Sequence, residues 1–302
     1  MKYPFENKGN PRLLGDHNSV PPPDKNFRTL RADCENCFGL CCVALYFSTM
    51  EGFPIDKEAG QPCINLQPDF RCCVYKSLKE QGLKGCLTFD CFGAGQKVSQ
   101  VSFGGRDWQK NQEFAKIMFD VFQIMRQLHE LLWYLTETLT LNAARSIHSD
   151  LSAMHAETEH LTYLSPDSLT QLDIAEHRAK VNILLQKTSE LVRTEARRGG
   201  NAHSGRQKTF GRRADLIAAD LRNANLRGAN LRGARLIAAD LRGTERIGTD
   251  FIAADFRDAD IRRADLSMCI FLTQAQINAA KGDMSTKLPS SLSRPTHWDT
   301  FK

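Results

Sequence analysis

The C-terminal part of the chain carries a hydrophobic pattern with a strict period of five residues. Large apolar side chains recur at this spacing, and a small residue stands two positions before each of them. The large residues are Leu216, Leu221, Leu226, Leu231, Leu236, Leu241, Phe251, Phe256, Ile261, Leu266 and Phe271. The small residues are Ala214, Ala219, Ala224, Ala229, Ala234, Ala239, Thr244, Thr249, Ala254, Ala259, Ala264 and Cys269. A period of five matches neither the 3.6 of a helix nor the 2.0 of a strand. The pattern therefore predicts a solenoid that turns a corner every five residues, with both sets of side chains inside.

Only Arg246 interrupts the series of large apolar residues. Burying a guanidinium without a partner would be costly. We therefore expect a local bulge of the coil at this position, with Arg246 turned toward solvent.

The middle of the chain has the alternating spacing of four and three that is typical of a coiled coil or helical bundle. This spacing holds for Phe114, Met118, Val121, Met125, Leu128, Leu132, Leu135 and Leu139. The pattern drifts after Leu141 and continues as Ile147, Leu151 and Met154. Ser165-Pro166-Asp167 then breaks it, and a second run follows at Ile174, Val181, Leu184 and Leu191. Two such runs on either side of a break predict an antiparallel helical hairpin.

These patterns divide the chain into six segments. They are an extended N-terminal segment at 1–32, a Cys-rich domain at 33–105, a helical hairpin or coiled coil at 106–198, a linker at 199–212, the repeats at 213–272, and a capping helix and tail at 273–302. The end of a solenoid exposes apolar interior and unpaired backbone, so it needs a cover. We expect residues 273–280 to form a short capping helix, with the tail around Trp298 packed against it.

The Ala-(Asp/Asn)-Leu-x-x repeat resembles the pentapeptide-repeat family. The resemblance implies a right-handed quadrilateral β-helix with four pentapeptides in each coil. Twelve pentapeptides would give three coils. Coils of twenty residues would stack Asp220, Asp240 and Asp260 in one column and Arg222, Arg242 and Arg262 in the column beside it. We interpret these columns as a solvated ladder of opposite charges. Apolar residues on the outside, such as Ile252 and Leu272, could receive the helical hairpin or a second chain.

Composition and charge exclude several classes of protein. Hydrophobic residues make up 41% of the chain and charged residues 25%, which excludes a disordered chain. The net charge of +5, from 40 basic and 35 acidic residues, disfavours a nucleic-acid partner. The apolar run at 41–47 is too short for a membrane helix, and the N-terminus lacks the apolar core of a secretory signal. We therefore expect a cytoplasmic protein without a membrane partner.

Cysteine usage supplies the candidate chemistry, because nine of the ten cysteines lie in the 33–105 segment. They are Cys34, Cys37, Cys41, Cys42, Cys63, Cys72, Cys73, Cys86 and Cys91. Without a secretory signal, this density favours metal binding over disulfides. Thiolates at Cys-x-x-Cys spacing can bind one ion, and thiolates from a second segment can complete a tetrahedron. Nine thiols exceed one zinc site, so two Zn²⁺ ions, or iron or an iron–sulfur cluster, are alternatives. In each adjacent pair, Cys41-Cys42 and Cys72-Cys73, we expect one member to be a ligand and the other to be buried packing.

The cysteine segment resembles the zinc/iron-chelating (YkgJ-like) cysteine-cluster family. The matching residues are Cys34-x-x-Cys37-x-x-x-Cys41-Cys42, then Cys63, Cys72-Cys73-Val74-Tyr75 and Cys86. Lys84-Gly85 stands where the family often has Arg-Pro before its last cysteine. The resemblance implies a chelated zinc or iron ion.

No catalytic constellation can be identified in the sequence. His148, His155, Glu159, His160 and His177 could form an interhelical metal site, but ordinary surface or packing positions are the favoured interpretation. The leading hypothesis is a binding or scaffold module, or a redox-responsive one, whose partner is another protein or a second copy on the helical hairpin or a solenoid face. One alternative is a metalloenzyme of natural-product metabolism with iron or zinc at the cysteine cluster. Another is an antibiotic-resistance protein that binds DNA gyrase or another topoisomerase, which the short and electrically neutral solenoid disfavours.

Overall fold

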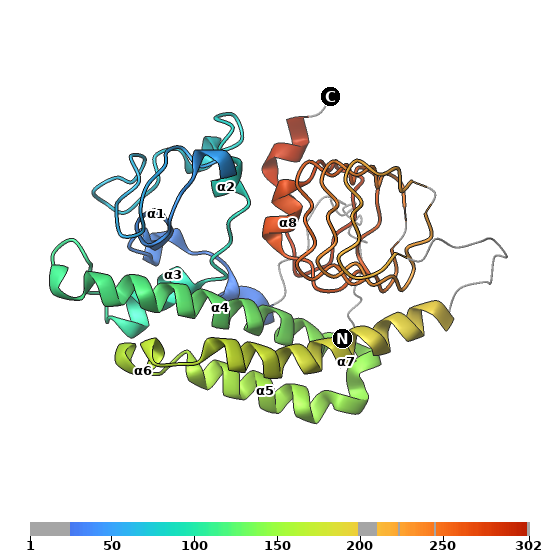
Figure 1. Cartoon of the computed structure of the whole chain (residues 1–302), viewed down its shortest axis with the longest axis horizontal. Coiled ribbons are helices and arrows are strands. Elements are labelled where there is room, and N and C mark those ends of the chain that lie inside the picture. Colours follow the sequence, from blue (N-terminus) through green and yellow to red (C-terminus); the bar gives the residue numbers. More distant parts are fainter. Residues whose placement is uncertain (1–24, 199–209, 223, 245, 301–302) are drawn as a thin grey trace, which may run out of the picture.

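The computed structural model describes residues 25–198, 210–222, 224–244 and 246–300. The chain forms a cysteine-rich domain and a coiled repeat region, and both lie against a layer of helices (Figure 1). Residues 1–24 of the predicted N-terminal segment and 199–209 of the predicted linker lie outside the described residues. Residues 25–32 were expected to be extended, but Lys25–Leu30 form the 3-10 helix η1. Its residue Phe27 is buried against Trp133, with the ring centroids 4.6 Å apart.

The cysteine-rich domain consists of short helices joined by loops. Its elements are η2 (Cys34–Asn36), α1 (Leu40–Ala44), η3 (Thr49–Glu51), η4 (Tyr75–Ser77), α2 (Lys84–Leu87), α3 (Ala94–Gln96), the π-helix η5 (Lys97–Ser102) and η6 (Gln112–Phe114). Two isolated antiparallel bridges, Phe47–Lys57 and Leu66–Cys72, connect its loops. Leu40 and Val43 of α1 are fully buried in a core that they share with the first half of the long helix α4.

The helical layer contains α4 (Ala115–Thr140), η7 (Asn142–Ile147), α5 (His148–Leu161), α6 (Pro166–Thr170) and α7 (Ile174–Arg198). Figure 1 shows α4, α5 and α7 running side by side, so the predicted two-helix hairpin is wrong and three long helices take its place. The chain leaves α4 at Leu141, whose φ of −87° and ψ of 116° are extended and cannot continue a helix. The break at 165–167 is confirmed, because the Ser165 side chain accepts from the Ser168 N–H and Pro166 begins α6.

The repeat region is a coil in which residues twenty positions apart lie side by side. Isolated parallel bridges connect Asp215 with Arg235, Asp220 with Asp240 and Asp240 with Asp260. The Leu216 N–H donates to the Arg235 carbonyl at 2.9 Å, and the Arg235 N–H donates to the Ala214 carbonyl at 2.9 Å. All eleven large residues of the five-residue series are buried. The solenoid with a packed interior is therefore confirmed. The described repeat residues pair through isolated bridges, and they form no strand longer than a single bridge.

Arg246 corrects the sequence-based expectation, because its side chain lies inside the coil with only 1% of its surface exposed. Its Nη2 donates to the Leu241 carbonyl at 2.7 Å and its Nη1 to the Thr244 carbonyl at 3.3 Å. Its Nε has no hydrogen-bond partner among the described residues. Burial lowers the pKa of Arg246 to about 10. Backbone carbonyls at a corner of the coil thus hold the guanidinium in place of the predicted exposure to solvent.

The end of the coil is covered as predicted. Helix α8 (Gln274–Ala279) begins at Thr273, which forms a capping box with Gln276. The tail continues to η8 (Thr296–Thr300), where Trp298 is 1% exposed and its Nε1 donates to the Ala280 carbonyl at 3.1 Å. A Cβ atom on Gly282 would lie 2.5 Å from the Trp298 ring, so only glycine leaves room for this ring.

Helix α4 connects the repeats with the rest of the protein. The Trp133 Nε1 donates to the Leu272 carbonyl at 3.2 Å, and the Glu137 Oε1 accepts from the Phe271 N–H at 2.8 Å. Leu272 is 1% exposed, which confirms that this outer apolar position receives a helix. No helix in the described part of the chain is both long and apolar enough to cross a membrane.

Glu137 should make the stability of the protein depend on pH. Burial raises the pKa of its carboxyl to about 8, with a smaller contribution from Asp250, against the lowering effect of the Phe271 N–H. The folded state therefore holds this proton more tightly than the unfolded state does. Protonated Glu137 therefore stabilises the folded state. This contribution to the free energy of unfolding is complete at a pH below the ordinary pKa of 4.5, and it is lost as the pH rises through 8. Glu137→Gln keeps a neutral acceptor, so thermal unfolding should show it more stable than wild type at pH 9, by on the order of a few kcal/mol, and equal at pH 4. A difference in stability between Glu137→Gln and wild type that stays the same at pH 4 and pH 9 would contradict the burial of this carboxyl.

Arg246 should be replaceable by the leucine that the repeat calls for. Arg246→Leu removes a buried charge, and the Leu241 carbonyl keeps its bond from the Thr244 hydroxyl at 2.7 Å. Apolar replacements of buried ionic groups are often neutral or stabilising. We expect the melting temperature to rise by about 2–4 °C. A fall of the same size would show that the guanidinium is needed to hold the corner.

Candidate metal centre in the cysteine-rich domain

The nine cysteines of the domain are all free thiols. Helix α1 supplies Cys41 and Cys42, whose Sγ atoms lie 4.0 Å apart. The Cys63 N–H donates to the Cys42 carbonyl at 2.9 Å, which brings the second cysteine segment against this helix. Arg71 ties the 71–73 segment to the first one, because its guanidinium donates to the carbonyls of Cys34 and Glu35. Backbone contacts thus gather thiols that lie far apart in the sequence.

Cys41 affects the ionisation of five other thiols of the domain. Burial raises the pKa of Cys34 to about 11 and those of Cys86 and Cys91 to about 12, and a thiolate on Cys41 raises each of them further. Burial also raises the pKa values of Cys37 and Cys63, and Cys41 adds to both. A thiolate on Cys41 therefore disfavours ionisation of all five of these thiols.

Cys41, Cys42 and Cys72 interact through their thiols. Pairing with the Cys42 thiol lowers the pKa of Cys41 and lowers that of Cys72 to about 6, although the single Cys42 proton can be donated to only one of them at a time. The same two interactions, together with burial, raise the pKa of Cys42. The trio therefore favours a thiolate on Cys41 or Cys72, and the Cys42 proton stabilises it. A thiolate is the form that binds metal ions.

One of the two adjacent pairs differs from the expectation of one ligand and one buried thiol. Cys41 and Cys42 are both half-buried, with their Sγ atoms 4.0 Å apart. Cys72 faces Cys42, whereas Cys73 is exposed, with its Sγ 3.9 Å from the Asn65 Oδ1. The second member of this pair is therefore turned toward solvent and is not buried. Outside the domain, Cys269 is buried in the repeat coil and donates to the Arg246 carbonyl at 3.1 Å.

The chemical type of these side chains suits a zinc or iron ion, because both metals bind soft thiolate ligands. The thiols also come from several segments of the chain, as the ligands of a metal site commonly do. Within the ranges that the structure describes, however, no three His, Cys, Asp or Glu side chains are arranged closely enough to hold a metal ion. The interhelical histidines are not such a group either. His155 contacts the Thr136 hydroxyl at 3.2 Å and His177 the Thr158 hydroxyl at 2.9 Å.

Lys57 is a functional candidate that the sequence did not reveal. Its side chain is 5% exposed, and its Nζ donates to the carbonyls of Val43, Leu45 and Glu58 and lies 4.4 Å from the centroid of the Phe47 ring. Burial lowers its pKa, while thiolates on Cys63, Cys42 and Cys41 raise it. A buried ammonium beside a thiolate cluster offsets negative charge there. Between Asp56 and Glu58, this lysine has the sequence context of a solvated surface residue.

Similarity to a known protein covers most of the chain. A family model for pentapeptide repeats matches eight copies, in residues 212–245 and 247–271. The uncharacterized protein YybG of Bacillus subtilis (strain 168) is 59% identical over 269 residues, which cover 89% of this chain and 95% of YybG. The chain belongs to the YybG family. The resemblance to pentapeptide repeats is thereby confirmed for the C-terminal region.

Two features of this YybG-family chain follow from the match. The family model skips residue 246, where the structure buries an arginine in place of the repeated apolar residue. The similarity to YybG covers far more than the repeats, so the family unit is larger than the solenoid.

Gly95 should control the position of Cys37. A Cβ atom on Gly95 would lie 2.7 Å from the Cys37 Sγ, so Gly95→Ala must displace this thiol. We expect Cys37 to react several-fold faster with a thiol reagent in this variant, as quantified by peptide mass spectrometry, because its packing against α3 is lost. Gly211→Ala is the control, since nothing lies within 4 Å of its added Cβ. Unchanged labelling of Cys37 would contradict the placement of this thiol against α3.

Proposed function

We propose that this YybG-family protein is a metal-binding scaffold module, in which the cysteine cluster binds Zn²⁺ and the repeat region offers a rigid surface to a partner. The observation that carries the proposal is the set of contacts that bring the cysteine segments together: the Cys41 and Cys42 Sγ atoms lie 4.0 Å apart, the Cys63 N–H donates to the Cys42 carbonyl, and Arg71 ties the 71–73 segment to the Cys34 and Glu35 carbonyls. Cys41, Cys42 and Cys72 are the central ligands in this proposal. Cys34, Cys37, Cys63, Cys86 and Cys91 supply the remaining donors, and Cys73 is left out.

A structural role for the ion explains how the cysteine-rich domain is built. The domain has short helices, loops and two isolated bridges in place of a sheet. Zinc cross-links such loops and adds its binding free energy to folding. The Lys57 ammonium would offset part of the negative charge of a thiolate-bound ion. Free thiols in all nine positions suit a reducing compartment, which supports a cytoplasmic location.

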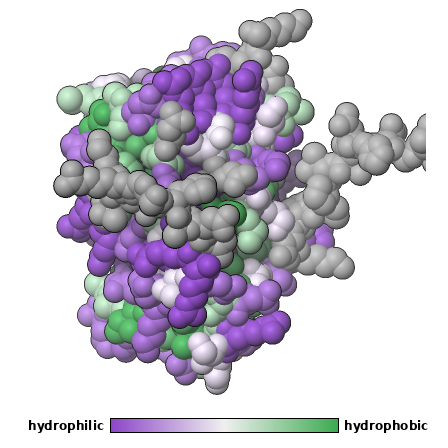
Figure 2. Space-filling model, turned by 90° about the vertical axis from the view of Figure 1, so that its right-hand side faces the viewer, coloured by the Kyte–Doolittle hydropathy of each residue, from purple (hydrophilic) through white to green (hydrophobic). Residues whose placement is uncertain are grey.

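The scaffold part of the proposal rests on the repeat coil. We interpret its bridges, twenty residues apart, as a right-handed quadrilateral β-helix with four pentapeptides in each coil. Figure 2 shows the end of the molecule where the repeats lie, and the part not covered by grey atoms is mostly hydrophilic, with hydrophobic residues in small groups. Such a surface suits a polar partner better than a broad apolar interface.

Replacing one central thiol should remove at least half of the bound zinc, whereas replacing the outward thiol should remove none. Protein purified without oxygen should contain one or two zinc ions per chain by elemental analysis. Cys41→Ser should lose at least half of this zinc, because Cys41 is one of the three central ligands of the proposal. Cys73→Ser is the matched control and should keep all of it.

The same pair of variants shows which result would contradict the proposal. Wild-type protein that holds no zinc, and that shows no thiolate-to-metal charge-transfer band when titrated with Co²⁺, would contradict a metal centre. Equal losses in Cys41→Ser and Cys73→Ser would contradict the proposed ligands. Circular dichroism of both variants separates loss of the ion from loss of the helices.

A further inference from the structure

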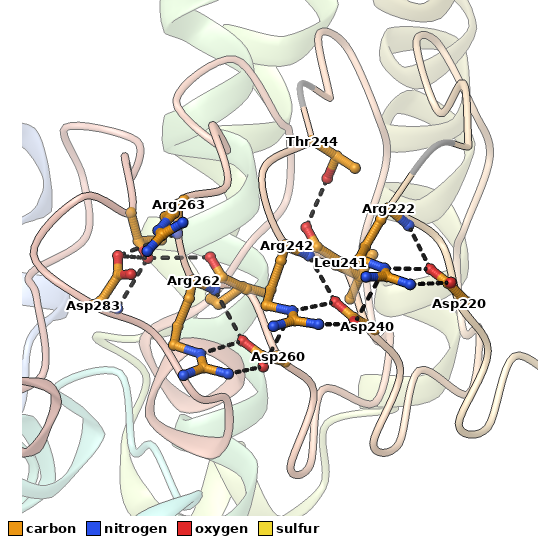
Figure 3. Close-up of polar contacts among 12 residues, drawn as sticks. Asp220, Arg222, Asp240, Leu241, Arg242, Thr244, Asp260, Arg262, Arg263 and Asp283 are labelled. Carbon is orange, nitrogen blue, oxygen red and sulfur yellow. Dashed lines mark hydrogen bonds and ion pairs between the residues drawn. The ribbon is translucent and has the colours of Figure 1, made fainter. Parts of the chain in front are cut away.

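A groove of about 350 Å³ crosses the coils of the repeat region. Its walls are Arg222, Arg242, Gly243, Arg262, Arg263 and Asp283. Figure 3 shows that Arg222, Arg242 and Arg262 form a row along the coil, with Arg263 and Asp283 beyond its end. Four arginines and one aspartate line the groove, and Arg222, Arg242 and Arg262 are each paired with an aspartate behind the wall, so the groove is distinguished by its guanidinium donors and not by its net charge.

Asp220, Asp240 and Asp260 hold Arg222, Arg242 and Arg262 in place, but they do not accept hydrogen bonds from every nitrogen of each guanidinium. Each guanidinium binds the aspartate of its own coil through Nε and Nη2, at 2.9–3.0 Å and 2.6–2.7 Å. The Nε atoms of Arg222 and Arg242 also lie 3.5 and 3.7 Å from the aspartate of the next coil. The third nitrogen, Nη1, has no acceptor among the described residues in any of the three. Asp220, Asp240 and Asp260 do not line the groove.

Arg263 differs from the other three because its side chain forms no ion pair with a described residue. The nearby Asp283 carboxylate is already engaged, since its Oδ1 accepts from the N–H groups of Arg263 and Ser285 and from the Thr286 hydroxyl. Arg263 is exposed and has an unusual φ of +59°, which the coil imposes at this corner. Its guanidinium is therefore available to a ligand.

We propose that this groove binds a linear oxyanion with several negative charges, of the class of linked phosphates. Guanidinium groups form strong, directional hydrogen bonds with phosphate oxygens. Successive coils lie about 4.8 Å apart, so the arginine row presents donors at regular steps that one small anion cannot span. A groove of this volume has room for a small ligand and is narrow for a folded peptide. This site is separate from the cysteine cluster and does not depend on it.

The row can be tested by calorimetric titration with tripolyphosphate in buffer free of divalent metals. Wild-type protein should bind one tripolyphosphate per chain, and at least 10-fold more tightly than it binds orthophosphate. Arg242→Gln and Arg263→Gln should each weaken binding about 10-fold, because each removes a charge-assisted contact. Arg263→Gln breaks no ion pair with any residue that the structure describes, so it tests the site even where Arg242→Gln lowers stability.

Arg257→Gln is the matched control. Arg257 forms the same kind of pair with Asp255, through Nε at 3.0 Å and Nη2 at 2.6 Å, but it does not line the groove. This variant should bind tripolyphosphate within 2-fold of wild type. Equal weakening in Arg257→Gln would show attraction by general surface charge and would overturn the proposal. No saturable binding, equal affinity for orthophosphate, or tighter binding of a hexaglutamate peptide than of tripolyphosphate would overturn it as well.

Discussion

The packing of α4 is the interaction on which the arrangement of the whole molecule depends. Met118, Val121 and Met125, in its first half, share a core with α1 of the cysteine-rich domain. Trp133 and Leu135, in its second half, share another core with the helices and the repeats. Among the described residues, the direct polar contacts between the two outer parts include the 2.8 Å ion pair of Lys84 and Asp258 at the surface and the part-buried hydrogen bond from the Asn278 side chain to the Leu87 carbonyl. Exposed pairs of this kind contribute about 0–1 kcal/mol, and one fully buried apolar side chain contributes more, so α4 determines how the parts are held together.

This arrangement gives the protein two regions of different chemistry on one body. The cysteine-rich domain lies against the first half of α4 and gathers soft thiolate donors with one buried ammonium. The repeat coil lies against the second half of α4 and presents permanently charged guanidinium groups, which donate hydrogen bonds. The metal-binding scaffold that we propose would use both regions, the thiols for the ion and the coil for a partner.

Patterns that depend on near neighbours could be predicted from the sequence, and contacts with distant segments could not. The repeat coil, the start of α6 at Ser165 and the capping box at Thr273 each follow from a few adjacent residues. The reversal after Leu141 escaped prediction because apolar spacing continues across it. Arg246 escaped because its acceptors are backbone carbonyls, which no residue type reveals. The cysteine cluster was predicted as a set, but the outward position of Cys73 and the burial of Lys57 depend on how the loops fold.

Native-state hydrogen exchange tests the role of α4 most directly. The amides of residues 131–138 and those of the repeat coil from 251 to 271 should open with one common free energy, because they share a core and the Trp133 and Glu137 hydrogen bonds. The same measurement should show the first half of α4 and the cysteine-rich domain protected together. If the repeats stay protected while residues 131–138 open at a much lower free energy, α4 does not hold the parts together and the account is wrong.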